Sequence, residues 1–105
     1  MANKKRFNSF EELLAGSETP VLVDFYTEWC GPCRMMGPIL EQVQAAMKDK
    51  LQVVKIDSER YSDLAERYQI HALPTLVLFK DGEPIDRIEG VSPPEELIER
   101  FKSLV

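Results

Sequence analysis

The run VLVDFYT at residues 21–27 has one charged residue among side chains that are mostly apolar. A run of this kind predicts a strand that is covered on both faces of a sheet. Apolar residues then recur at helical spacing from Met36 to Met47, and LQVVKID at residues 51–57 predicts a second buried strand. Because a helix-sized connection joins the two strands, we expect them to be parallel.

The rest of the chain predicts further helices and an antiparallel hairpin. Ser9 starts a capping-box pattern and predicts a short helix. An Asp-Gly dipeptide between residues 75–80 and 84–89 predicts a tight hairpin, and Pro93 and Pro94 open a final helix. This order of elements predicts an α/β fold with a mixed sheet between helices.

Length and composition exclude several classes of protein. A chain of 105 residues, 44% hydrophobic and 30% charged, suits a single globular domain, and its net charge of −5 argues against binding nucleic acid. No apolar run approaches the roughly 20 residues of a membrane helix, so we expect no membrane association. No apolar signal segment follows the first basic residues, so we expect a cytoplasmic protein, or a plastid stromal one if a transit peptide was removed.

The two cysteines of the chain lie in the motif WCGPC. Cys30 follows the first strand and Cys33 enters the helix, so their sulfurs lie on one side of the first turn, close enough to bridge. The free backbone donors at a helix start favour a thiolate on Cys30, while Cys33 should be shielded. Gly31 leaves the approach open, and Pro32 fits the first turn. The pattern predicts that Cys30 attacks and Cys33 resolves.

Two other interpretations of this region stay open at the level of the residues alone. A structural zinc site needs four ligands, and two cysteines with His71 supply three; we therefore disfavour a metal and place His71 at the surface. Trp29 is the only tryptophan. It fits a docking surface beside the nucleophile and a core position equally well.

Two charged residues interrupt the predicted buried strands. Asp24 and Lys55 should face packed helices, where an isolated charge is costly, so we expect them to pair or to have shifted pKa values. The alternative is that each lies at a strand end facing water. In the functional interpretation, Asp24 accepts the proton of the resolving thiol and Lys55 moderates its proton affinity.

The segments VDFYTEWCGPCRMMGPILEQV, VVKID, LPTLVLFKDGE and IEG resemble the thioredoxin family, in order and at the family's intervals, from about residue 8 to the end. FYTEWCGPCRMMGP resembles the members found in cyanobacteria and plastids. The resemblance implies one thioredoxin domain over residues 1–105, with a central five-stranded mixed sheet flanked by four helices. The first strand would lie in KKRF, residues 4–7. It also implies a monomeric protein-disulfide reductase without a cofactor, which receives electrons from an NADPH- or ferredoxin-dependent thioredoxin reductase and passes them to disulfide-containing client proteins.

The resemblance also implies roles for individual residues. Cys30 would be the attacking thiolate, Cys33 the resolving thiol, Asp24 the buried proton-transfer carboxylate and Lys55 its neighbour. Pro74 would be a cis-proline beside the active site that keeps metals out. The residues expected to bind the client are Trp29, Gly31, Pro32, Leu73, Pro74 and Gly90. Glu28 and Glu89 depart from the family pattern and would place negative charge near this surface.

The sequence admits three functions. The leading hypothesis is reduction of client disulfides. The second is a disulfide oxidant or isomerase, whose usual His in place of Pro32 is missing here. The third is a binding module in which the cysteines play no part, and the intact WCGPC motif argues against it.

Overall fold

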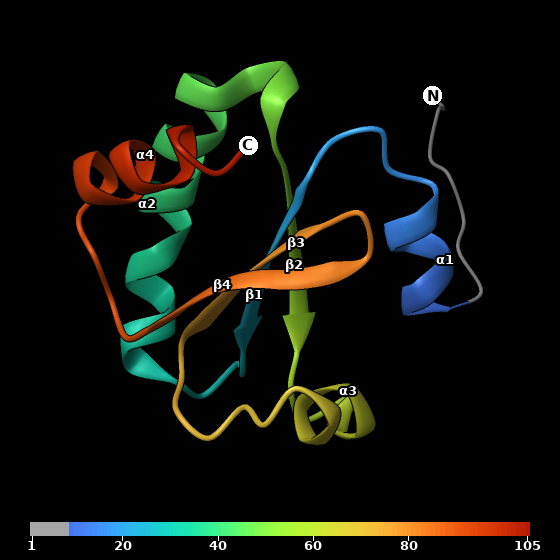
Figure 1. The fold of residues 1–105 in the computed structure, drawn as a ribbon. Helices are drawn as coiled ribbons and strands as arrows, with labels where there is room; N and C mark the ends of the chain where they lie inside the picture. The colour runs from blue at the N-terminus through green and yellow to red at the C-terminus, as the bar shows by residue number, and fades with distance from the viewer. Residues whose placement is uncertain (1–8) are drawn as a thin grey trace, which may run out of the picture.

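The computed structural model describes residues 9–105 (Figure 1). Along the chain the elements are α1 (Phe10–Ala15), β1 (Val21–Tyr26), α2 (Gly31–Met47), a short 3-10 helix (Lys48–Lys50), β2 (Gln52–Asp57), α3 (Ser62–Arg67), β3 (Thr75–Lys80), β4 (Glu83–Glu89) and α4 (Pro94–Lys102). Within these residues no helix combines the length and apolar character needed to span a membrane.

The strands form one mixed sheet in the order β2-β1-β3-β4. β1 and β2 are parallel, as predicted, and the pairs β1–β3 and β3–β4 are antiparallel. The predicted α/β fold with four α-helices is confirmed, but the described sheet has four strands rather than five. The fifth strand was expected at residues 4–7, which lie outside the described residues.

Helices cover both faces of the sheet. Successive side chains of a strand point to opposite faces, so each strand contributes to two cores. Leu22 belongs to the core beneath α2 and α4, and its neighbour Val23 belongs to the core beneath α1 and α3. Figure 1 shows α2 and α4 together on one side of the sheet, with α1 and α3 away from them. The two cores thus fix which face each residue of β1 presents.

Local sequence signals determine where these elements begin and end. The Ser9 side chain accepts a hydrogen bond of 3.1 Å from the backbone N–H of Glu12 and so caps α1. Asp81 and Gly82 have φ values of 54° and 81°, the left-handed pair that a two-residue hairpin requires. Pro93 and Pro94 stand at the start of α4, as predicted.

The prediction that β2 is a buried strand is wrong. Only Ile56 is buried in Gln52–Asp57, and Lys55 is exposed. The sheet order explains the difference, because β2 is an outer strand of the described sheet and its residues are less buried than those of the inner strand β1. A sequence that does not reveal the order of its strands cannot distinguish an outer strand from a central one by apolar content alone.

Candidate active site

The strand register brings four segments of the chain together at one end of the sheet. β1 and β2 run in parallel and end side by side, with Tyr26 opposite Asp57. β3 is antiparallel to β1, so Thr75 at its start lies opposite Phe25, and Glu89 near the end of β4 lies opposite Thr75. The connections after β1, after β2, before β3 and after β4 therefore meet at this end.

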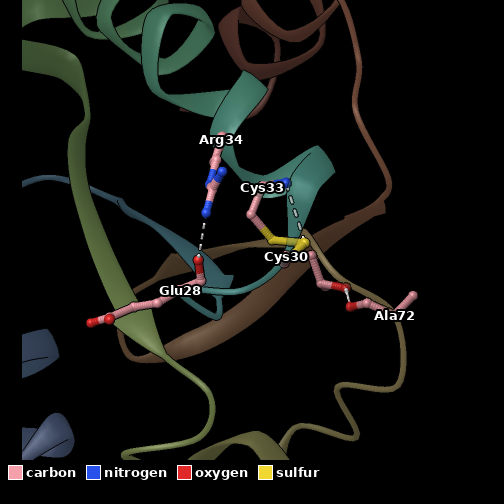
Figure 2. The surroundings of a disulfide bond; sticks show 6 residues. Glu28, Cys30, Cys33, Arg34 and Ala72 are labelled. Carbon is pink, nitrogen blue, oxygen red and sulfur yellow. Dashed lines mark hydrogen bonds between the residues drawn. A yellow bond between two sulfur atoms is a disulfide. The ribbon is translucent and has the colours of Figure 1, made fainter.

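The two cysteines form a disulfide bond at the start of α2 (Figure 2). Their Cα atoms are 5.3 Å apart. Cys30 is the N-cap residue, and its Sγ accepts a hydrogen bond of 3.2 Å from the backbone N–H of Cys33. Gly31 and Pro32 occupy the exposed first positions of the helix, and a Cβ built on Gly31 meets nothing within 4 Å. The predicted placement of the pair on the first turn is confirmed.

The predicted difference in exposure between the two cysteines is wrong for this disulfide form. Cys30 is 7% exposed and Cys33 is 5% exposed, so both are buried. A bond between the two sulfurs makes each cover part of the other. What distinguishes them is position: Cys30 caps the helix and receives a backbone hydrogen bond, whereas Cys33 lies within the first turn.

Asp24 lies in the middle of β1 and is fully buried. It shares a face with Leu22, so it points toward the α2 and α4 side of the sheet. Neither carboxylate oxygen has a hydrogen-bond partner among the described residues. Burial raises the pKa of Asp24 from 3.8 to about 6, and the positive charge of Lys55 opposes this rise.

Lys55 lies opposite Asp24 in the parallel register, but it is exposed and forms no ion pair with Asp24 within residues 9–105. Its Nζ lies 4.9 Å from the centroid of the Tyr26 ring, a cation–π contact. The prediction that Lys55 is a buried partner is wrong: Lys55 faces water, although from within β2 and not from a strand end as the alternative supposed. Lys55 acts on Asp24 through its charge alone.

Pro74 closes the connection into β3. The Leu73–Pro74 peptide bond is cis, as the resemblance implied, and Pro74 is buried. The backbone N–H of Gly90 donates a hydrogen bond of 2.8 Å to the carbonyl of Pro74. Gly90 has a φ of 89°, a left-handed conformation that suits glycine. Figure 2 includes Ala72, from the same connection, among the surroundings of the disulfide.

Trp29 is an exposed residue beside the disulfide. Its exposure decides against a core position and favours the predicted docking surface. Its side chain is 67% exposed, and its Nε1 donates a hydrogen bond of 2.9 Å to Oε2 of Glu59. Met35, Tyr61 and Val91 are further large exposed apolar residues of this chain. Sequence reasoning missed Glu59, although a signal existed: Glu59 follows β2, and the ends of parallel strands meet at one edge of the sheet.

The two acidic residues that depart from the family pattern are also exposed. The backbone carbonyl of Glu28 accepts a hydrogen bond of 3.4 Å from Nη2 of Arg34, so its carboxylate is not used in this contact (Figure 2). The carboxylate of Glu89 lies 3.7 Å from Nε of Arg87. His71 is exposed, as predicted.

Comparison with known proteins gives consistent results. The family model Thioredoxin matches residues 2–103. The chain is 56% identical to a thioredoxin-like protein of Synechocystis over the full length of both chains. It is also 56% identical to chloroplastic thioredoxin Y1 of Arabidopsis thaliana over 96% of this chain and 59% of that protein. The chain thus spans about three fifths of the Arabidopsis relative.

The fold is similar to the solved structure of a mitochondrial protein. Mitochondrial thioredoxin 3 of Saccharomyces cerevisiae, in its oxidized form, aligns with a TM-score of 0.80 and 37% identity. The alignment covers 90% of this chain and 86% of the yeast chain.

Proposed function

The chain belongs to the thioredoxin family, and we propose that it reduces disulfide bonds in client proteins as a thiol–disulfide oxidoreductase. The observation that carries this proposal is the Cys30–Cys33 disulfide at the N-terminus of α2. There the two cysteines can alternate between a disulfide and two thiols, and the dithiol form holds the two electrons that reduce a client disulfide. The proposal covers residues 1–105 as a single thioredoxin domain.

Reduction of a client proceeds by two exchange steps. The Cys30 thiolate attacks one sulfur of the client disulfide, the client S–S bond breaks, and the other client sulfur leaves as a thiolate. Cys33, once deprotonated, then attacks the Sγ of Cys30 in the mixed disulfide. This step forms the Cys30–Cys33 bond and releases the second client thiolate, so two electrons pass from the protein to the client.

The Cys33 backbone N–H stabilises the first state of this cycle. It already donates to the Cys30 Sγ across 3.2 Å in the disulfide. A thiolate at the same position would accept a stronger, charge-assisted bond, and the partial positive charge of the helix start adds to this effect. The result is a lowered pKa for Cys30 in the reduced protein.

Asp24 is proposed as the proton acceptor for Cys33. It is buried on the α2 side of β1, its oxygens have no protein partner among residues 9–105, and its pKa of about 6 allows it to hold and release a proton near neutrality. Lys55 tunes that pKa from the surface by its charge.

Client binding is proposed for the surface around the disulfide. The backbone of Leu73 would pair with an extended segment of the client, as an added strand pairs with a sheet edge. The proposed docking surface consists of Trp29, Gly31, Pro32, Leu73, Pro74 and Gly90. Exposed Trp29 and half-buried Leu73 and Gly90 support this assignment.

The partners and compartment follow from the same chemistry. A separate NADPH- or ferredoxin-dependent thioredoxin reductase would return the disulfide to the dithiol, and the protein would hold no cofactor of its own. We propose a monomer that works in the cytoplasm or the plastid stroma, reducing compartments in which the dithiol state persists.

The test is insulin reduction with dithiothreitol as the electron source. Wild-type protein should accelerate the reduction, and Cys30→Ser should have no activity, because it lacks the attacking sulfur. Immobilised Cys33→Ser should retain clients as mixed disulfides that dithiothreitol releases. Full activity of Cys30→Ser would reject the mechanism. A measured potential far above the family's reducing range would reassign the protein as an oxidant.

A further inference from the structure

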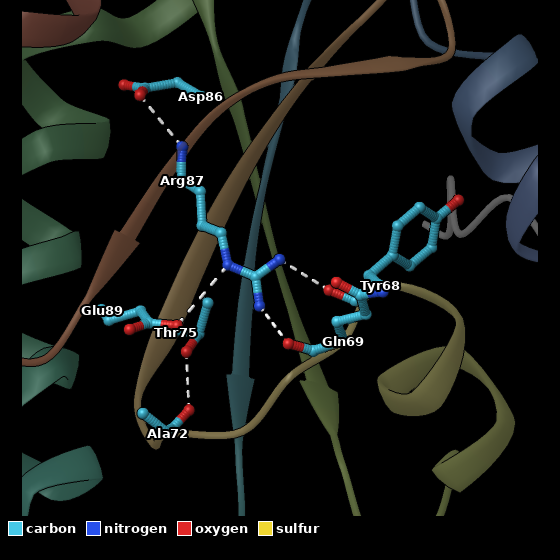
Figure 3. Close-up of polar contacts among 7 residues, drawn as sticks. All are labelled: Tyr68, Gln69, Ala72, Thr75, Asp86, Arg87 and Glu89. Carbon is cyan, nitrogen blue, oxygen red and sulfur yellow. Dashed lines mark hydrogen bonds and ion pairs between the residues drawn. The ribbon is translucent and has the colours of Figure 1, made fainter.

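The loop of residues 70–74 is attached at its upstream end to β4 and at its downstream end to Gly90, the residue that follows β4; Figure 3 shows the contacts at the upstream end. At its downstream end, the Gly90 N–H donates to the carbonyl of Pro74 across 2.8 Å. At its upstream end, Nη1 of Arg87 donates a hydrogen bond of 2.6 Å to the carbonyl of Tyr68, and Nη2 donates to the carbonyl of Gln69. β4 and the residue directly after it therefore hold both ends of the loop that contains the proposed client-binding backbone.

The contacts of Arg87 suit the end of a helix. α3 ends at Arg67 with Tyr68 as its C-cap residue, and Gln69 has a φ of 54° in the left-handed region. Carbonyl groups at a helix C-terminus lack partners within the helix, and a cation there is stabilising. The guanidinium group suits this place because its fork can donate to two carbonyls at once.

The Arg87 side chain is itself held in place. Its Nε lies 3.7 Å from Oε2 of Glu89, two residues further along the same strand. Arg87 pairs with Val77 and Glu89 pairs with Thr75, so both residues are anchored to β3 by the strand register. From the start of β3, the hydroxyl of Thr75 donates a hydrogen bond of 2.6 Å to the carbonyl of Ala72 in the loop (Figure 3).

We infer that Arg87 is a positioning residue for client binding: it fixes the upstream end of the 70–74 loop to the sheet and thereby orders the backbone of Leu73 before a client arrives. This inference rests on the proposed function. A loop that is ordered in advance loses less conformational entropy on binding, so the client binds more tightly. Arg87 does not touch the cysteines, and the exchange chemistry itself should not depend on it.

The test compares wild type with Arg87→Met in single-turnover reduction of insulin, followed by the fluorescence of Trp29. The dissociation constant of the encounter complex should rise about tenfold, because two charge-assisted hydrogen bonds are lost. The rate at saturating insulin, and the reduction of the small disulfide 5,5′-dithiobis(2-nitrobenzoate), should each change by less than about twofold. Arg87→Lys keeps the charge but not the fork, and it should give an intermediate dissociation constant.

Arg100→Met is the matched control. Arg100 donates bonds of 2.7 Å to each carboxylate oxygen of Asp86, a residue adjacent to Arg87 on β4, and it does not contact the loop. This variant also removes a two-bond guanidinium contact to a residue of β4, but it should leave the dissociation constant for insulin unchanged. Hydrogen exchange should accelerate at the amides of His71, Ala72 and Leu73 in Arg87→Met and not in Arg100→Met.

Three results would overturn the inference. They are an unchanged dissociation constant in Arg87→Met, an equal loss of rate for insulin and the small disulfide, or an equal weakening in Arg100→Met. Failure of the wild type to reduce insulin would instead count against the proposed function, and the exchange rates of the loop amides would still decide whether Arg87 holds the loop. If Arg87→Met does not fold, Arg87→Lys provides both measurements.

Discussion

The indole N–H of Trp29 donates a hydrogen bond of 2.9 Å to Oε2 of Glu59, a residue 30 positions later in the chain. This contact ties the segment after β1 to the segment after β2. It also holds a side chain that is 67% exposed in one orientation beside the disulfide. An exposed tryptophan without such a contact would lose rotamer freedom when a client covers it.

Glu59→Leu should therefore weaken client binding without changing the chemistry of the cysteines. A lost hydrogen bond to a charged group predicts a rise of about threefold to tenfold in the dissociation constant for insulin. Glu59→Gln keeps an acceptor for the indole and is the control, with most of the affinity retained. Equal affinities for the Glu59→Leu variant and the wild type would show that the contact does not organise the docking surface.

The position of Cys30 at the N-cap predicts a low pKa for its thiol. In the reduced protein it should titrate below the free value of about 8.5, because the helix start and a backbone N–H favour the thiolate. The rate of alkylation by iodoacetamide against pH, in a Cys33→Ser variant, measures this titration directly. A midpoint at or above the free value would show that the N-cap position does not activate Cys30.

Burial predicts very different costs for shortening two apolar side chains, one in the core and one at the surface. Phe101 on α4 is fully buried in the core between α2, α4 and the sheet, so Phe101→Ala should lower the free energy of unfolding by about 3–5 kcal/mol. Ile85 on β4 is 41% exposed, and Ile85→Ala should cost much less. Urea denaturation measures both. Similar costs for the two variants would contradict the assignment of Phe101 to the core.

Asp24→Asn should slow the second exchange step. An amide cannot accept the proton of Cys33, so turnover at pH 7 should fall by about tenfold or more while the equilibrium potential changes little. Lys55→Met is the companion variant. Removing the charge that lowers the pKa of Asp24 should move the acid limb of the rate profile to higher pH. An unchanged rate in Asp24→Asn would remove Asp24 from the mechanism.

Much of this site could be predicted from sequence because its signals are local. The cysteine spacing, with glycine and proline between the sulfurs, places Cys30 and Cys33 on one helical turn without knowledge of the rest of the fold. The burial of Asp24 follows similarly from the apolar residues on either side of it. The cis bond before Pro74 required the family resemblance, because the residues alone did not indicate it.

The remaining features depend on the order of the strands, which the sequence pattern did not give. Lys55 is exposed because β2 is the outer described strand, and the pattern of Gln52–Asp57 alone suggested burial. The contacts of Glu59 with Trp29 and of Arg87 with Gln69 join residues 30 and 18 positions apart. Such contacts become visible only when the register places the ends of the strands side by side.

The buried carboxyl of Asp24 should also make the stability of the protein depend on pH. The pKa of Asp24 is 3.8 when unperturbed and about 6 in the folded protein, so between these values the folded state binds more protons than the unfolded state. The contribution of Asp24 to the free energy of unfolding is therefore favourable at low pH and declines as pH rises from about 4 to about 6. The loss reaches about 3 kcal/mol above pH 6.

Asp24→Asn should remove this decline. Its free energy of unfolding should match the wild type near pH 4 and exceed it by up to about 3 kcal/mol above pH 6, as urea denaturation at a series of pH values would show. Asp86 provides a control of opposite sign, because a hydrogen bond from Arg100 holds its pKa below the usual value. Its contribution is present at neutral pH and is lost as pH falls, so Asp86→Asn should destabilise the protein at pH 7. If the difference in free energy of unfolding between Asp24→Asn and the wild type stays constant from pH 4 to pH 7, Asp24 does not titrate in its buried position.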